Sequence, residues 1–197
     1  MSSRDVVLGR IRASLAGSAP AVDVPRDYRP ALGAAASLDL LVERLADYKA
    51  VVHRAAAVAP VVAEIVSGAL VVPPGLDLSW VPSSVSALVD DGLPASAIAA
   101  ADGVLTAAAI AIAETGTIVL DASPDQGRRI ISLLPDLHIC VLRPAQVVGG
   151  VPDAVARLTP GRPLTWISGP SATSDIELNR VEGVHGPRNL HVILLEE

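Results

Sequence analysis

A carboxylate, two hydroxyls and a glycine stand together in the most apolar stretch of the chain. The segment Ala113-Glu114-Thr115-Gly116-Thr117 lies within residues 102–121, with apolar residues on both sides. Burying a charged or hydroxyl group costs free energy unless the group is paired, so this cluster is either a paired structural turn or a site. In a site, Glu114 could act as a carboxylate nucleophile or base.

A second polar cluster, Ser168-Gly169-Pro170-Ser171-Ala172-Thr173-Ser174-Asp175, follows an apolar segment at 164–167. Strand ends line the ligand crevice of a parallel sheet, and a loop rich in Ser, Thr and Gly offers amides and hydroxyls to an anion. The alternative is a self-capped turn, with Ser174 or Asp175 as the cap of a helix. The segment matches neither the dinucleotide fingerprint nor the phosphate loop of NTPases.

A histidine between glycines forms the third cluster, Gly183-Val184-His185-Gly186-Pro187. His185 could be an acid or base, or could bind an anion or a metal, but a lone loop histidine often has none of these roles. His138 and His191 lie in apolar segments and are interpreted as structural, and His53 has no companion in the sequence. A metal site needs three or more convergent ligands, and no such motif is present, so we expect no bound metal.

We expect the three clusters to meet at one end of a sheet, with Glu114 and His185 as candidate catalytic residues. The candidate ligand-binding residues have hydroxyls, no side chain or, in one case, a carboxylate: Thr115, Gly116, Thr117, Ser168, Gly169, Ser171, Thr173, Ser174 and Asp175. The hydroxyls would hold a carboxylate or phosphate. The acidic members argue against a purely anion-binding pocket, and at least one would instead hold a ligand hydroxyl or a loop amide.

The elements that must position these clusters alternate between strand and helix patterns. Hydrophobic residues make up 51% of the 197 residues and aromatics only 2%, so the core must consist of Ala, Val, Leu and Ile. This predicts an α/β fold, an open and mainly parallel sheet with flanking helices. Helices are expected at 3–15, 38–49, 60–70, 94–101, 128–134 and 151–158, and strands from 51 and at 71–72, 117–120, 137–142, 164–167 and 190–195.

The first 36 residues form a separate unit in this interpretation, followed by an α/β domain over 37–197. A helix at 3–15 has an apolar stripe of Val6, Val7, Ile11 and Leu15, and a segment broken by prolines follows it. Because an apolar stripe needs cover, we expect the helix to dock on the main body or on a neighbouring subunit of a homo-oligomer. The segment at 17–36 is interpreted as a solvated linker, and the alternative is that it crosses onto another subunit.

Composition excludes several partners and cofactors. The net charge is −6, without a basic cluster, which argues against a nucleic-acid partner. Cys140 is the only cysteine, so the chain cannot itself ligate an iron–sulfur cluster; its apolar neighbours indicate an inert core residue. No apolar stretch reaches the roughly 18 residues of a membrane helix, and no signal peptide is visible. We therefore expect a soluble cytoplasmic protein without a membrane partner.

Four segments together resemble the lactate utilization protein C (LutC) family of LUD-domain proteins: residues 111–120, 137–141, 166–177 and 181–187. The resemblance is strong over residues 100–197. It implies a fold like that of the sugar-phosphate isomerase and CoA-transferase group. It also implies a place in the oxidation of L-lactate to pyruvate, beside partner subunits that carry iron–sulfur clusters. With one cysteine, this chain matches the cluster-free member.

Two functions remain open from the sequence. In the first, the chain is an accessory, cluster-free subunit of a lactate oxidation system that binds a small anionic ligand or a partner subunit. In the second, it is an enzyme of the CoA-transferase or sugar-phosphate isomerase type that uses Glu114 on an acyl or phosphorylated substrate. Geometry discriminates between them, because the enzyme needs Glu114 and His185 to face one pocket.

Overall fold

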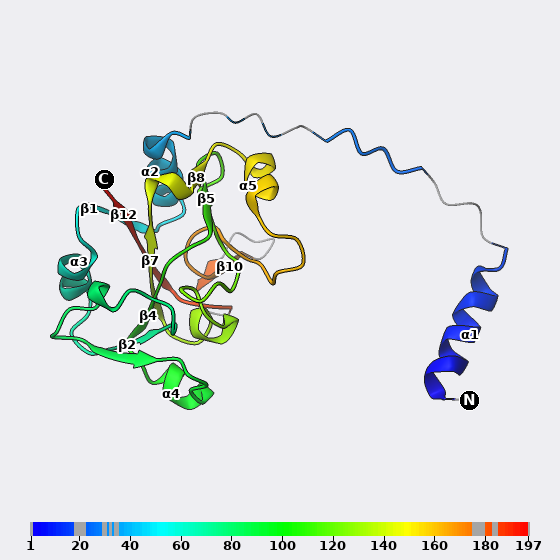
Figure 1. Ribbon diagram of the computed structural model, residues 1–197, viewed down its shortest axis with the longest axis horizontal. Coiled ribbons are helices and arrows are strands. Elements are labelled where there is room, and N and C mark those ends of the chain that lie inside the picture. The colour runs from blue at the N-terminus through cyan, green and yellow to red at the C-terminus, as the bar shows by residue number, and fades with distance from the viewer. Residues whose placement is uncertain are drawn as a thin grey trace.

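A six-stranded, wholly parallel sheet forms the centre of the molecule (Figure 1). The computed structural model describes residues 2–17, 23–28, 31, 33, 36–174, 180–182 and 185–196. Along the sheet the strands are β1 (Val51–Ala55), β12 (Asn189–Leu195), β7 (Leu137–Leu142), β4 (Gly103–Thr106), β2 (Ala69–Val72) and β3 (Ser86–Val89). The inner strands are buried on both faces, which is why they are continuous apolar runs. The predicted fold class is confirmed.

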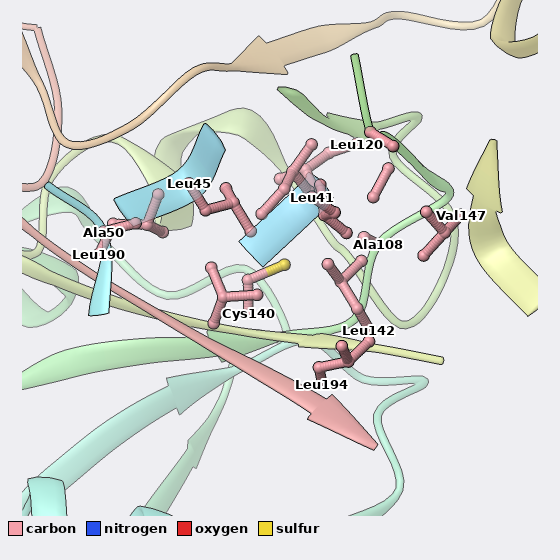
Figure 2. Packing of buried hydrophobic residues seen from close by; sticks show 14 residues of the cluster. Leu41, Leu45, Ala50, Ala108, Leu120, Cys140, Leu142, Val147, Leu190 and Leu194 are labelled. Atoms are coloured by element: carbon pink, nitrogen blue, oxygen red, sulfur yellow. The ribbon is translucent and has the colours of Figure 1, made fainter. Parts of the chain in front are cut away.

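Alternate residues of β7 face two different helices. On one face, Cys140 and Leu142 pack against Leu41 and Leu45 of α2 (Leu38–Asp47), as Figure 2 shows. On the other face, Ile139 and Val141 belong to a second apolar core, which includes the buried side of α3 (Val58–Ile65). Two separate apolar cores therefore hold the sheet between helices.

The cap expected for α2 is present. The hydroxyl of Ser37 accepts a hydrogen bond from the amide of Leu40 at 3.1 Å, which satisfies one of the free amides of the first turn. Leu41 and Leu45, one turn apart, are both fully buried. Local sequence signals were therefore sufficient for this element.

A second sheet packs against the same apolar core as α2. The sequence analysis did not predict this sheet. Its order is β8 (Val147–Val148), β5 (Ile110–Ile112), β6 (Thr117–Leu120) and β9 (Thr165–Ile167). β5 and β9 both pair antiparallel with β6, and α5 (Val151–Arg157) contacts β5 and β8. The prediction that residues 164–167 join the parallel sheet was wrong, because β9 instead completes this mixed sheet.

Several other elements differ from the prediction. Residues 172–174 form β10 (Ala172–Ser174), which pairs antiparallel with β11 (Arg180–Glu182), so Ser174 is not a helix cap. The helix expected at 128–134 is a short 3-10 turn, η2 (Arg129–Ser132). The helix expected at 60–70 begins and ends earlier, as α3. At the start of β2, Asp102 accepts the amide of Ala69, and a side chain at Gly68 would collide with that carboxylate.

The remaining short elements connect the strands. They are α4 (Ala95–Ala99) and two further 3-10 turns, η1 (Leu78–Trp80) and η3 (Pro144–Gln146). None of the helices in the described ranges is both long and apolar enough to cross a membrane.

The amino-terminal helix α1 (Ser3–Leu15) has the predicted bounds but lies apart from the main body (Figure 1). A capping box between Ser2 and Asp5 begins it. None of its residues is buried, and Val7 and Leu15 are 55% and 61% exposed. The expected docking on the main body of the same chain is therefore not observed, and docking on a neighbouring subunit stays a prediction. So does the division of the chain at residue 36.

Candidate functional site

A cavity of about 240 Å³ lies where the second sheet meets the amino ends of β7 and β12. Its wall comes from η2, from the first residues of these two strands, and from β9 with the loop that follows. The polar residues and the tryptophan of the wall are Arg129, Ser132, His138, Thr165, Trp166, Ser168, Ser171 and His185. Ser168, Gly169, Ser171 and His185 were expected at one site, and the structure brings them together.

The position of this cavity corrects the topological prediction. The crevice was expected at the carboxyl ends of the parallel strands, where open α/β sheets usually bind ligands. His138 and Leu190 line the cavity, and each stands at the start of its strand. The Ser168 loop does not follow a strand of the parallel sheet, because β9 belongs to the second sheet, where it pairs with β6.

Three hydroxyls connect the hairpin between β5 and β6 to this cavity. Thr115 Oγ1 donates to Thr117 Oγ1 at 2.8 Å, and Thr117 Oγ1 lies 2.8 Å from Ser168 Oγ. The strand register causes this contact, because Ile118 pairs with Ile167 and so places Thr117 beside Ser168. Thr115 and Thr117 themselves lie behind the cavity wall rather than in it.

Two of the predicted glycines have a packing role. Gly116 has a φ of +59°, and a Cβ there would lie 2.8 Å from Cβ of Arg44 in α2. Gly169 has a φ of +86°, and a Cβ there would lie 2.7 Å from the carbonyl oxygen of Tyr48. Both positions thus require glycine for turn geometry and for the close approach of the end of α2.

Hydrogen bonds join the Ser171 and His185 loops. The amide of His185 donates to Ser171 Oγ at 3.1 Å, and the amide of Ser171 donates to the carbonyl of Pro187 at 2.8 Å. His185 is exposed while Ser171 is half-buried. The loop that precedes β12 is therefore held against the loop that follows β9, and together they close one side of the cavity.

Arg129 contributes a positive charge that the sequence analysis missed. Its Nη1 donates to Ser132 Oγ at 3.2 Å, and Ser132 Oγ donates back to the carbonyl of Arg129. Among the described residues, no carboxylate lies within ion-pair distance of this guanidinium. The sequence analysis placed Arg129 in a helix at 128–134 and gave it no role in a site.

His138 was expected to be structural, and it is almost fully buried, at 1% exposure. Its Nε2 lies 2.8 Å from Thr106 Oγ1 of β4. Burial, assisted by the charge of Arg129, lowers the pKa of His138 to about 4. The imidazole is thus neutral at physiological pH, and it also forms part of the cavity wall.

The other two strand histidines form a pair. His53 Nε2 lies 3.0 Å from His191 Nδ1, so the expectation that His53 has no companion was wrong. Burial and the neighbouring His53 lower the pKa of His191. Parallel pairing of β1 with β12 creates this contact across 138 positions of sequence. Neither residue lines the cavity.

Glu114 lies at the exposed turn between β5 and β6. Its amide donates to the carbonyl of Gly149, and a Cβ added at Gly150 would lie 3.1 Å from its Oε2. The carboxylate is thus next to the start of α5, and Glu114 does not line the cavity. Its catalytic role, like that of His185, stays a prediction.

The rest of the predicted set is placed only in part. Thr173 and Ser174 lie in β10, and Asp175 falls outside the described residues. Within the ranges that the structure describes, no group of three or more His, Cys, Asp or Glu could hold a metal. The cavity therefore combines one cation, a neutral imidazole and serine hydroxyls, a set suited to binding a small oxyanion.

Comparison with known proteins places this cavity inside a family match. The LUD domain model matches residues 95–195, which include every residue of the cavity wall. The chain is 45% identical to lactate utilization protein C of Deinococcus radiodurans, over 96% of this chain and 93% of that protein. It is 36% identical to lactate utilization protein C of Bacillus subtilis, over 44% of this chain and 39% of that protein.

A solved structure has the same fold. The crystal structure of a DUF162 family protein from Deinococcus radiodurans superposes with a TM-score of 0.69 at 38% sequence identity. The match covers 81% of this chain and 96% of that one. The parallel sheet with its flanking helices is thus shared with a protein determined by experiment.

Proposed function

Because the chain belongs to the LUD-domain family, we propose that it serves lactate utilization as a cluster-free subunit that binds a small carboxylate. The names of its relatives support the lactate system. The cavity beside Arg129 supports the carboxylate. The ligand is held there between the guanidinium and the serine hydroxyls.

The observation that carries this proposal is Arg129 at the cavity wall without a carboxylate partner in the described chain. Guanidinium groups bind carboxylates through parallel hydrogen bonds. The chain has a net charge of −6, so its overall field repels anions and a local cation must supply the attraction. A volume of about 240 Å³ suits a molecule of few heavy atoms.

Redox chemistry, in this proposal, is left to partner subunits with iron–sulfur clusters. Cys140 is the only thiol. It is buried, and burial raises its pKa to about 12, which disfavours the thiolate needed to ligate iron. The purified chain is expected to be colourless, with far less than one iron per chain. Stoichiometric iron with a visible absorbance band contradicts this part.

The position of Glu114 supports a binding role over the enzymatic alternative. Its carboxylate is exposed and stands outside the cavity wall. A carboxylate nucleophile or base must reach the reacting atoms of a bound ligand. A Glu114→Gln variant is therefore expected to bind the ligand of the cavity as the wild type does.

A thermal-shift screen tests the proposal directly. The panel contains lactate, pyruvate, CoA esters, sugar phosphates and nucleotides. A ligand at about 100 times its dissociation constant stabilises the native state by about 2.7 kcal/mol. Arg129→Gln is expected to weaken binding about 10-fold or more, because a hydrogen bond to a charged group contributes roughly 1.5–3 kcal/mol.

The matched control is Arg12→Gln, which removes the same charge from the exposed helix α1. It is expected to bind like the wild type. The proposal fails if no small carboxylate in the panel stabilises the protein, or if Arg129→Gln and Arg12→Gln bind equally well.

A further inference from the structure

The hydroxyl chain behind the cavity is directed toward it. Thr115 Oγ1 donates to Thr117 Oγ1, so the hydrogen of Thr117 must find another acceptor. Ser168 Oγ is 2.8 Å away, whereas the carbonyl of Thr115 is 3.5 Å away. The shorter contact is the better hydrogen bond. Ser168 therefore accepts from Thr117, and its own hydrogen is free to donate into the cavity that it lines.

Thr106 sets the direction at His138 in the same way. The hydroxyl of Thr106 has two acceptors within reach, Nε2 of His138 at 2.8 Å and Sγ of Cys140 at 4.0 Å. The nitrogen is closer, and sulfur is only a weak acceptor. It thus donates to Nε2. A neutral imidazole has one N–H, which must then be on Nδ1.

The Nδ1 atom of His138 opens into the cavity. It has no hydrogen-bond partner in the described chain. Within the same residues, no side-chain nitrogen or oxygen is both sealed from solvent and without a partner. Because the rest of the ring is buried and the residue lines the cavity, Nδ1–H reaches the cavity as a donor.

Two further donors complete the wall. Ser171 Oγ accepts the amide of His185, which leaves its hydrogen free. Arg129 uses Nη1 for Ser132, which leaves most of its five N–H groups free. Four groups of the wall, Arg129, His138, Ser168 and Ser171, thus offer hydrogen to the cavity. The hydroxyl of Ser132 does not, because it accepts from Arg129 and donates back to the carbonyl of Arg129. None of the described residues of the wall is an Asp or Glu.

We propose that the ligand is a short 2-oxo carboxylate, held through its carboxylate by Arg129 and through its carbonyl oxygen by the neutral donors of the wall. This inference rests on the proposed function, in which the cavity binds a small carboxylate. A 2-oxo acid presents only acceptors to such a wall. A 2-hydroxy acid brings one hydrogen more, and a buried donor without an acceptor costs about 1–3 kcal/mol.

Titration calorimetry on the full chain with pyruvate, L-lactate and acetate tests the inference. Pyruvate is expected to bind about 10-fold more tightly than lactate, the equivalent of about 1.4 kcal/mol. Acetate, which lacks the carbonyl oxygen, is expected to bind more weakly than pyruvate. Nitrogen-15 NMR of the imidazoles in the ligand-free protein is expected to show His138 protonated on Nδ1.

Two variants test the neutral hydrogen-bond donors of the wall without changing the charge of Arg129. Thr106→Val and Thr117→Val each remove one hydroxyl that sets the direction of a hydrogen bond to a wall residue. Valine keeps the shape of the threonine side chain. Each is expected to reduce the preference for pyruvate over lactate while both acids still bind. Thr159→Val, at an exposed residue outside the cavity, is the matched control and is expected to keep the wild-type ratio.

The outcomes distinguish the two proposals. If lactate binds as tightly as pyruvate or more tightly, or if His138 is protonated on Nε2, the 2-oxo acid assignment is overturned while carboxylate binding stands. If neither acid binds and Arg129→Gln changes nothing, the proposed function itself fails. The NMR measurement needs only the wild type, so it decides the donor direction even where a valine variant does not fold.

Discussion

Nε2 of the buried imidazole of His138 lies 2.8 Å from the hydroxyl of Thr106, a neighbour across two adjacent parallel strands. His138 is only 1% exposed, and this contact gives its buried Nε2 a hydrogen-bond partner. Burial in turn lowers the pKa of His138 to about 4. A histidine held neutral in this way makes the stability of the fold depend on pH.

Acidification is expected to destabilise the protein through His138. Its pKa is 6.5 in the unfolded chain and about 4 in the folded one, so between these values the unfolded state binds a proton that the native state does not. The free energy of unfolding should thus fall as the pH drops from 6.5 to 4, by roughly 3 kcal/mol from this residue. Urea denaturation across this range measures it.

The control for this prediction is a pair of variants. His138→Gln should make the pH dependence between 6.5 and 4 clearly shallower and leave the part that His191 contributes. His185→Gln, at an exposed residue, should leave it as in the wild type. Equal slopes in all three proteins would show that His138 does not cause the effect.

Replacing Asp90 by Asn should destabilise the fold by about 1–3 kcal/mol. The side chain of Asp90 is buried and accepts two hydrogen bonds from Arg128 and one from the amide of Leu93. The hydrogen bonds from Arg128 lower the pKa of Asp90, so the carboxylate is charged at neutral pH. Because half of Arg128 is exposed, solvent reduces the loss.

Asp39→Asn is the surface counterpart. Asp39 pairs with Arg54 at the surface, where their side chains are 87% and 43% exposed, and such pairs contribute about 0–1 kcal/mol. Chemical denaturation should rank Asp90→Asn clearly below Asp39→Asn in stability. Equal losses would contradict the importance of the buried pair.

Cys140 should resist alkylation in the native protein. It is fully buried between α2 and the sheet, and burial raises its pKa to about 12 (Figure 2). Iodoacetamide reacts with the thiolate, so mass spectrometry should find the native chain unmodified and the urea-unfolded chain modified. Ser79→Cys, at an exposed position, should add one rapidly labelled thiol. Fast labelling of native Cys140 would refute its assignment as an inert core residue.

Deleting residues 1–17 should leave the melting temperature of the dilute protein unchanged, because no residue of α1 is buried. If the apolar stripe docks on a neighbouring subunit, the deletion should reduce self-association in sedimentation velocity. Val7→Asp, at an exposed position of that stripe, should do the same. Unchanged sedimentation of both variants would mean that the arm is only a tail, and a lower melting temperature would mean that it packs on its own chain.

The sequence alone determined which segments are buried and what class of fold they form. The β7 segment is a continuous apolar run, and α2 has a cap at Ser37 with leucines one turn apart, so both were predicted close to their observed bounds. These signals are local, because burial and backbone preference are written in neighbouring residues. The family resemblance, confirmed by comparison, likewise rests on contiguous motifs.

Only the tertiary structure decided which polar groups meet. Thr117 and Ser168 are 51 positions apart, His53 and His191 are 138 apart, and Arg129 lies beside loops that precede β12. Their contacts depend on strand order and register: β9 pairs antiparallel with β6 instead of entering the parallel sheet, and β1 pairs in parallel with β12. Pairing partners are chosen by the fit of whole faces, so no window of sequence around any one of these residues contains that information.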